Sequence, residues 1–117
     1  MSEVKAVLYG DSDRCNPCRL ALAALKRAGI PTGYFNTSRS SIMTDPNDPS
    51  KKITINNQER LKIRLKNLGI TWNGYIPQIF IKDPDYFKNN KFNHIGGYDE
   101  LVGYGNDPGY LSKSGKV

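Results

Sequence analysis

The first elements of the fold are set by residues 4–36, which read VKAVLYGDSDRCNPCRLALAALKRAGIPTGYFN. Residues 4–9 are β-prone and the turn formers of residues 10–13 follow them, so they predict a strand that ends in a loop. From Cys15 onward a helical period predicts an apolar face made of Leu20, Ala21, Ala24, Leu25 and Ala28. Gly29 and Pro31 end this helix, and residues 32–36 predict a second strand. This order predicts a parallel βαβ unit with the cysteine pair at the start of its helix.

The rest of the chain continues the same α/β pattern. Residues 38–50 are polar and contain two prolines, which predicts a loop, and the connection over residues 83–93 is much longer than a hairpin turn. A second helix is predicted from Asn56, which has capping-box spacing to Glu59 and precedes a buried face of Leu61, Leu65 and Leu68. Strands are predicted at residues 76–81 and 92–95, and a short helix at residues 98–104. The element order is therefore β-α-β-α-β-β-α.

Length and composition favour one domain without a membrane span. A chain of 117 residues fits a single core, which we expect over residues 1–104, followed by a Gly-rich extension over residues 105–117. The sequence has no apolar run of 18 residues, and its first residues lack the pattern of a signal peptide, so we expect a cytoplasmic protein that binds no membrane.

The net charge of +6 does not by itself indicate a nucleic-acid partner. Many of the basic residues alternate with apolar positions, as on the solvated face of a helix; they are Lys51, Lys52, Arg60, Lys62, Arg64 and Lys66. Because no nucleic-acid motif accompanies them, we expect the basic surface to steer an acidic protein or a small dicarboxylate instead.

The two cysteines, Cys15 and Cys18, are the chemically informative residues. A structural zinc site needs four Cys or His ligands, and the chain offers only these two and the distant His94. Thiol–disulfide exchange needs an attacking thiolate and a second thiol that resolves the mixed disulfide, and Cys-x-x-Cys at a helix start supplies both. We therefore expect Cys15 to be the nucleophile, assisted by Arg14 and the helix N-terminus, and Cys18, one turn further in, to be the resolving thiol.

Three blocks of sequence together resemble a glutaredoxin. They are Cys15-Asn16-Pro17-Cys18, Ile76-Pro77-Gln78-Ile79-Phe80-Ile81 and Gly96-Gly97-Tyr98-Asp99-Glu100-Leu101. Two further stretches are similar to the glutaredoxins of tailed bacteriophages, namely Tyr9-Gly10-Asp11-Ser12 and His94-Ile95-Gly96-Gly97. The resemblance covers residues 4–104 and implies a thioredoxin-like α/β fold, in which helices flank a central four-stranded mixed sheet.

The resemblance also implies a binding site for glutathione. In this family the proline that matches Pro77 follows a cis peptide bond, which would turn the backbone of Ile76 toward Cys15. The segment that matches Gly97, Tyr98 and Asp99 holds the γ-glutamyl end of glutathione, through backbone N–H groups and the Asp99 carboxylate. Arg14 stands in for the lysine that the family commonly carries ahead of the first cysteine.

The activity that the resemblance implies is that of a glutathione-dependent dithiol–disulfide oxidoreductase, and we expect the protein to be a monomer. Glutathione would be its co-substrate and no cofactor would be tightly bound. The phage branch further implies ribonucleotide reductase as an electron acceptor, in the host cytoplasm.

Two other activities remain open from the sequence. A thioredoxin-like reductase recharged by a flavoenzyme is favoured by Pro17 and opposed by Asp99. In an iron–sulfur carrier, Cys15 and glutathione from two subunits would hold one cluster, a reading that Pro17 and the intact Cys18 oppose.

Overall fold

The computed structural model describes residues 3–105 and contains a central sheet of four strands. In the order in which they lie side by side, the strands are β2 (Thr32–Asn36), β1 (Ala6–Gly10), β5 (Gln78–Ile81) and β6 (Asn93–Gly96). Strand β1 runs parallel to β2, whereas β5 is antiparallel to both of its neighbours. The predicted mixed sheet and the parallel βαβ unit at its start are therefore confirmed.

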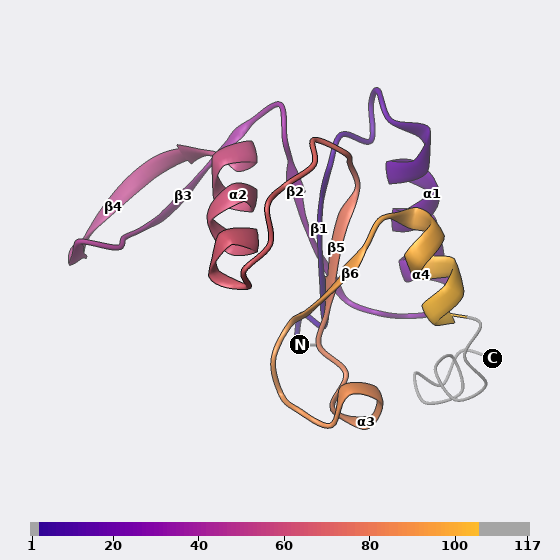
Figure 1. Cartoon of the computed structure of the whole chain (residues 1–117). Helices are drawn as coiled ribbons and strands as arrows, with labels where there is room; N and C mark the ends of the chain where they lie inside the picture. The colour runs from indigo at the N-terminus through magenta and orange to yellow at the C-terminus, as the bar shows by residue number, and fades with distance from the viewer. Residues whose placement is uncertain (1–2, 106–117) are drawn as a thin grey trace.

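Helices cover both faces of this sheet (Figure 1). Helices α1 (Asn16–Arg27) and α4 (Tyr98–Gly105) lie together on one face, and α2 (Asn57–Asn67) lies on the other. The side chains of a strand alternate between the two faces, so β1 sends Leu8 to the α1 and α4 side and Tyr9 to the α2 side. Each face thus has its own apolar core, and both cores hold β1 in place.

Two leucines that the sequence analysis assigned to buried helix faces are exposed. Leu20 of α1 is 42% exposed, because the buried face of this helix is centred on Cys18, Ala21 and Leu25. Leu20 lies about 100° around the helix from Ala21, which turns it toward solvent. Leu68 is 49% exposed, because it is the C-cap of α2 and lies beyond the last turn that faces the sheet.

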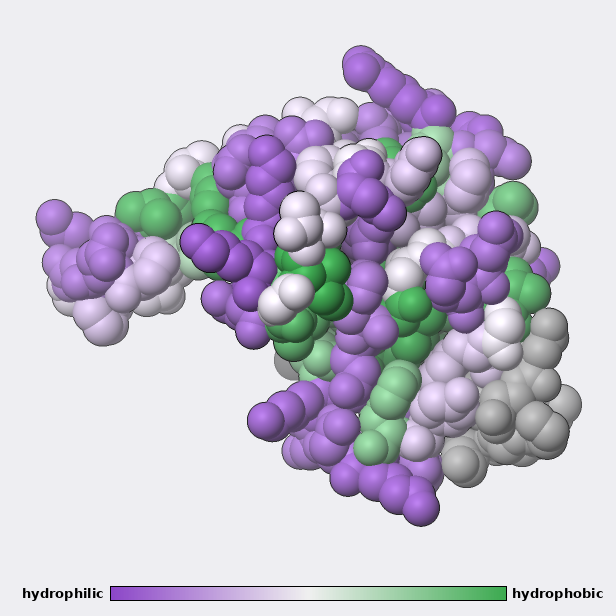
Figure 2. Space-filling view, in the orientation of Figure 1, coloured by the Kyte–Doolittle hydropathy of each residue, from purple (hydrophilic) through white to green (hydrophobic). Residues whose placement is uncertain are grey.

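Residues 40–56 form a β-hairpin where the sequence analysis predicted a loop over residues 38–50. Strand β3 (Ser40–Asp45) pairs antiparallel with β4 (Asp48–Asn56) in a separate two-stranded sheet that projects from the body beside α2 (Figure 1). Hydrophilic side chains cover its tip (Figure 2). The loop prediction was wrong because both strands are mostly polar and Pro49 interrupts the pattern. An edge strand tolerates proline, since a backbone N–H at its outer edge needs no partner.

The base of the hairpin is tied to the central sheet by Asn57, which is only 4% exposed. Its backbone N–H donates to the carbonyl oxygen of Arg39 at 2.9 Å, and its Nδ2 donates to the carbonyl oxygen of Asn36 at 2.8 Å. Asn36 is the last residue of β2 and pairs with Gly10, the last residue of β1. The hairpin therefore starts at the end of the sheet from which the cysteine loop departs.

The long connection over residues 83–93 contains a further short helix, α3 (Pro84–Phe87). The Asp83 side chain caps it by accepting hydrogen bonds from the backbone N–H groups of Asp85 and Tyr86. The rings of Tyr86 and Phe87 pack against Tyr104 of α4, with centroid distances of 4.4 and 5.6 Å. This segment therefore packs against α4.

The sequence analysis expected the basic residues to lie on one solvated helix face, but the structure does not place them on one face. Lys51 and Lys52 lie in strand β4, whereas Arg60 and Arg64 are half-buried on α2. The guanidinium group of Arg60 lies 4.6 Å from the centroid of the Phe35 ring, and that of Arg64 lies 4.8 Å from the centroid of Phe80. These two cations cover aromatic residues of the α2 face.

Residues 3–105 contain no helix that is both long and apolar enough to cross a membrane. Residues 106–117, which make up nearly all of the predicted C-terminal extension, lie outside the described residues.

Candidate active site

Cys15 and Cys18 lie at the start of α1, where the sequence analysis predicted them, and they form a disulfide with a Cα–Cα distance of 5.2 Å. Cys15 is the N-cap of the helix, and its Sγ accepts a hydrogen bond from the backbone N–H of Cys18 at 3.2 Å. Cys15 is partly exposed, whereas Cys18 is 0% exposed. An external thiolate can therefore approach only the Cys15 sulfur. Pro17 occupies the first turn, where a missing N–H leaves no bond unmade.

The loop that delivers Cys15 to the helix is organised by Asp11, which is 6% exposed. Its carbonyl oxygen accepts a hydrogen bond from the backbone N–H of Cys15 at 2.8 Å. Its carboxylate accepts hydrogen bonds from the hydroxyl of Ser38 at 2.7 Å and from the backbone N–H of Asp13 at 3.1 Å. The Ser38 hydrogen bond is the main cause that holds the pKa of Asp11 below its ordinary value. Asp11 thereby links the cysteine loop to the segment that leads into the hairpin.

Gly10 is a site residue that the sequence analysis described as a turn former and as part of the Tyr9-Gly10-Asp11-Ser12 stretch, without giving it a role in the site. A Cβ atom on Gly10 would lie 2.6 Å from the Sγ of Cys18 and 3.2 Å from its Cβ. The buried Cys18 sulfur therefore lies directly against the end of β1, and only a residue without a side chain fits there. A glycine at the end of a strand that leads into a Cys-x-x-Cys loop is the sequence signal for this contact.

The peptide bond between Ile76 and Pro77 is cis, as the resemblance implied. The carbonyl oxygen of Ile76 lies 3.7 Å from the Sγ of Cys15, and Pro77 is buried directly ahead of β5. The backbone of Ile76 thus faces the exposed cysteine, and the two segments are 61 residues apart in sequence.

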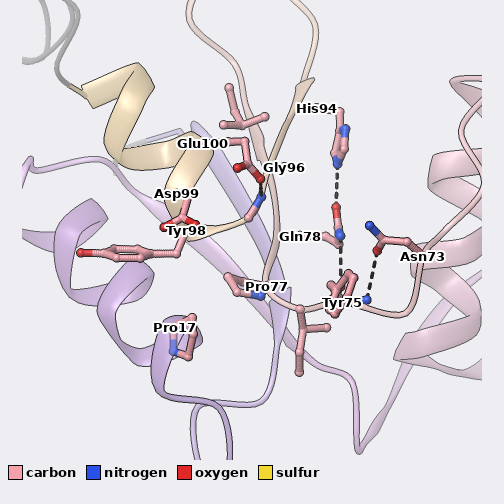
Figure 3. Close-up of a pocket in the computed structure, with 13 residues that line it drawn as sticks. Pro17, Asn73, Tyr75, Pro77, Gln78, His94, Gly96, Tyr98, Asp99 and Glu100 are labelled. Carbon is pink, nitrogen blue, oxygen red and sulfur yellow. Dashed lines mark hydrogen bonds between the residues drawn. The ribbon is translucent and has the colours of Figure 1, made fainter.

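A cleft of about 490 Å³ opens beside this contact (Figure 3). Its walls come from the start of α1, the segment ahead of β5, strands β5 and β6, and the start of α4. The lining residues are Pro17, Asn73, Tyr75, Ile76, Pro77, Gln78, His94, Ile95, Gly96, Gly97, Tyr98, Asp99 and Glu100. The structure therefore brings five predicted glutathione-binding residues into one cleft, namely Ile76, Pro77, Gly97, Tyr98 and Asp99.

Arg14 differs from the other predicted binding residues in its position. Its side chain is 83% exposed, and its Nε lies 4.0 Å from a carboxylate oxygen of Asp11. It is not among the residues that line the cleft. Arg14 therefore lies beside Asp11, and Arg14 is not part of the cleft walls.

The start of α4 forms the acidic wall of the cleft. Asp99 and Glu100 are both exposed, and the Glu100 carboxylate accepts a hydrogen bond from the backbone N–H of Gly97 at 2.8 Å. Glu100 thus occupies the N–H of Gly97, which is one of the backbone donors that the resemblance assigns to a carboxylate of glutathione. Gly96 leaves room for the Glu100 carboxylate in this hydrogen bond. Its φ of +119° favours glycine, and a Cβ there would lie 2.7 Å from the Oε1 of Glu100.

A hydrogen-bonded chain in the wall of the cleft was not predicted from the sequence. The Nε2 of His94 and the Oε1 of Gln78 are 2.7 Å apart, and the Nε2 of Gln78 donates to the carbonyl oxygen of Tyr75 at 3.0 Å (Figure 3). Burial lowers the pKa of His94, and the nearby Glu100 carboxylate partly opposes this shift. The sequence analysis considered His94 as a metal ligand and as part of a motif. Among residues 3–105, no group of three or more His, Cys, Asp or Glu side chains is arranged to hold a metal ion.

The sheet order, the helices on its two faces and the cysteine pair at the start of α1 define a thioredoxin-like α/β fold. One solved structure that is similar to this chain is glutaredoxin 1 from Francisella tularensis in complex with cacodylate. The similarity has a TM-score of 0.52 at 20% sequence identity, and it covers 87% of this chain and 92% of that chain. This similarity supports the predicted fold. No protein-family model and no curated protein sequence matches the chain.

Proposed function

We propose that this protein is a dithiol–disulfide oxidoreductase of the glutaredoxin type. It would use glutathione to reduce protein disulfides or glutathione mixed disulfides. The observation that carries the proposal is the asymmetry of the cysteine pair, in which a partly exposed Cys15 at a helix N-cap is bonded to a fully buried Cys18.

The proposed reaction cycle balances with glutathione as the only reductant. The Cys15 thiolate attacks one sulfur of the substrate disulfide, and the other substrate sulfur leaves as a thiolate that takes up a proton. The Cys18 sulfur then attacks the Sγ of Cys15, which releases the second substrate thiol and forms the Cys15–Cys18 disulfide described above. Two glutathione thiols then reduce this disulfide in two exchange steps: they donate two electrons to it and leave as one molecule of glutathione disulfide.

The start of α1 supports a thiolate on Cys15. Its Sγ lies 3.2 Å from the backbone N–H of Cys18, which remains available as a donor when the disulfide is open. The positive end of the helix dipole adds about 0.3–1 kcal/mol at an exposed site. Together these interactions favour the charged form of the sulfur that faces solvent.

The cleft beside Cys15 is the proposed glutathione site. The backbone of Ile76 would pair with the glutathione peptide as a short added strand, because its carbonyl already faces Cys15. Tyr98 and the exposed Asp99 carboxylate would hold the γ-glutamyl end, with Asp99 pairing with its ammonium group. Since Glu100 occupies the N–H of Gly97, Asp99 is the group on which we expect this recognition to depend most.

The finer parts of the proposal rest on the sequence motifs. They are the likeness to the glutaredoxins of tailed bacteriophages, ribonucleotide reductase as an electron acceptor, a monomeric state and a location in the host cytoplasm. Purified ribonucleotide reductase, recharged by this protein and glutathione, provides a direct test of the proposed acceptor.

The deciding experiment is the turnover of a glutathione mixed disulfide with glutathione, NADPH and glutathione reductase as the only electron supply. We expect turnover that depends on Cys15 and is absent in Cys15→Ser. We further expect Asp99→Asn to raise the KM for glutathione about tenfold with little change in kcat. The matched control is Asp85→Asn, which removes an exposed carboxylate from α3 and should leave the KM unchanged.

A thioredoxin-like reductase recharged by a flavoenzyme is the second candidate. Two observations favour it: Pro17 lies between the cysteines, and the N–H of Gly97 is occupied by Glu100. Absence of turnover with glutathione, together with reduction by NADPH and thioredoxin reductase, would select this candidate. Asp99 would then have no role in electron supply.

A further inference from the structure

Tyr75 is the most exposed of the large apolar residues among those the structure describes, with 73% of its surface accessible to solvent. It lines the cleft and directly precedes Ile76, whose carbonyl oxygen lies 3.7 Å from the Sγ of Cys15. A large exposed aromatic ring therefore lies one residue away from the backbone that faces the exposed sulfur. Tyrosine is enriched at protein interfaces, where its ring buries apolar area and its hydroxyl remains solvated.

The backbone of Tyr75 is fixed by three hydrogen bonds. Its carbonyl oxygen accepts from the Nε2 of Gln78 at 3.0 Å and from the indole Nε1 of Trp72 at 2.9 Å. Its N–H donates to the Oδ1 of Asn73 at 3.0 Å. Because the main chain is held, only the two side-chain torsions of Tyr75 remain free. When a partner binds and orders this ring, the loss of conformational entropy is therefore small.

Gln78 can hold Tyr75 in this way because it is itself oriented by His94. Gln78 is 6% exposed, and its amide nitrogen is committed to the carbonyl of Tyr75. Its Oε1 must then be the acceptor in the 2.7 Å contact with His94, so the Nε2 of His94 carries the proton. A chain of part-buried donors and acceptors thus runs from β6 through β5 to the rim of the cleft, as Figure 3 shows.

The rim of the cleft near Cys15 is apolar, whereas its opposite wall is acidic. Exposed Pro17, half-buried Ile76 and Tyr75 form the apolar side, and Asp99 and Glu100 form the other. A protein partner whose disulfide reaches Cys15 must lay the residues beside its cysteine along this rim. An apolar neighbour of that cysteine would bury its surface against the ring of Tyr75.

We propose that Tyr75 is a substrate-docking residue that selects protein disulfides whose cysteine is flanked by a large apolar side chain. This inference rests on the proposed function and adds a substrate preference to it. The Trp72, Asn73 and Gln78 contacts hold the backbone of Tyr75 at the rim. His94 is a positioning residue that acts through Gln78.

The test uses two synthetic disulfide-linked peptides, in which leucine or serine flanks the cysteine, with dithiothreitol as the electron donor. We expect Tyr75→Ser to raise the KM for the leucine peptide about tenfold, which corresponds to about 1.4 kcal/mol, with kcat changed less than twofold. The KM for the serine peptide should change little. Tyr75→Phe should retain the leucine preference, because the ring remains.

The matched control is Ile42→Ser, which removes another exposed apolar side chain, 69% exposed, from the hairpin. It should leave both KM values unchanged. Equal effects of Tyr75→Ser on the two peptides, or none on either, would overturn the docking role and leave the oxidoreductase proposal standing. A wild-type protein that reduces neither peptide would instead contradict the proposed function itself.

Discussion

Gly10 at the end of β1 lies so close to Cys18 that a Cβ atom on Gly10 would come within 2.6 Å of the Cys18 Sγ. The neighbour in this contact is a fully buried side chain whose sulfur is held in the disulfide, so it has little room to move. We expect Gly10→Ala to lower the free energy of unfolding of the oxidised protein by about 1–3 kcal/mol, the usual cost of overpacking a core. Urea unfolding monitored by circular dichroism measures this change.

The matched control for Gly10 is Gly33, a glycine of the neighbouring strand β2. A Cβ atom on Gly33 would approach no atom closer than 3.7 Å, which is ordinary van der Waals contact. Gly33→Ala should therefore leave stability within about 1 kcal/mol of wild type, or raise it by restricting the unfolded chain. Equal losses in the two variants would mean that the contact with Cys18 is not the cause.

The different exposure of the two cysteines predicts different phenotypes for their serine variants. Cys15→Ser should abolish all turnover, because it removes the only sulfur of the pair that a substrate can reach. Cys18→Ser should keep exchange with glutathione mixed disulfides and lose the reduction of protein disulfides, since the resolving thiol is absent. Parallel assays with a glutathione mixed disulfide and a protein disulfide separate the two steps. A Cys18→Ser protein that is inactive toward both would reverse the assigned roles.

The hydrogen bond from Ser38 to Asp11 predicts how the cysteine loop responds to acid. It holds the pKa of Asp11 below the ordinary value of 3.8, so Ser38→Ala should raise that pKa. Because the folded pKa is the lower one, this interaction stabilises the protein above pH 3.8, and the contribution is lost as the pH falls through the folded pKa. Carboxyl NMR titration measures the pKa directly.

Ser50→Ala is the control for this prediction, because Ser50 makes the equivalent hydrogen bond to Asp48 in the hairpin. It should raise the pKa of Asp48 and leave that of Asp11 unchanged. If the pKa of Asp11 were the same in Ser38→Ala as in the wild type, the Ser38 hydrogen bond would not be the cause of the lowered pKa.

His94 predicts a second pH dependence, nearer neutrality. Burial beside Phe80 and Gln78 lowers its pKa below 6.5, while Glu100 opposes this shift. The unfolded chain therefore binds the proton more readily, so the contribution of His94 to stability is complete above pH 6.5 and decreases as the pH falls toward the folded pKa. Glu100→Gln should lower the pKa of His94 further, whereas Asp85→Asn should not change it. His94 is the only histidine, so its imidazole NMR signal is unambiguous. A pKa above 6.5 would contradict the prediction.

The sequence was sufficient to predict an element where the local pattern and the tertiary structure agree. The helix that begins after Cys15 has an N-cap, a proline in its first turn and a clear apolar period, and the structure contains it as predicted. Asn56 likewise caps α2, with its Oδ1 accepting from the N–H of Gln58. At both places local chemistry alone specifies the element.

The sequence was insufficient where the structure depends on distant contacts. Strands β3 and β4 are mostly polar, and each becomes a strand by pairing with the other, which no local pattern of residues 38–50 indicates. The roles of Gly10, Gln78 and Asn57 arise from neighbours that are distant in sequence or that only the folded backbone brings together, namely Cys18, His94 and Asn36. Such pairs can be recognised only once the sheet has placed them.

The separate sheet of the hairpin has a consequence for how this chain can vary. The strand pairing of β3 and β4 is internal to the hairpin, and its base is anchored through Asn57 to the last residue of β2. Residues can therefore be added to or removed from its tip in pairs without changing the register of the four central strands or the position of Cys15. Evolution or protein engineering can therefore change the length and the surface residues of the hairpin while the redox centre stays the same.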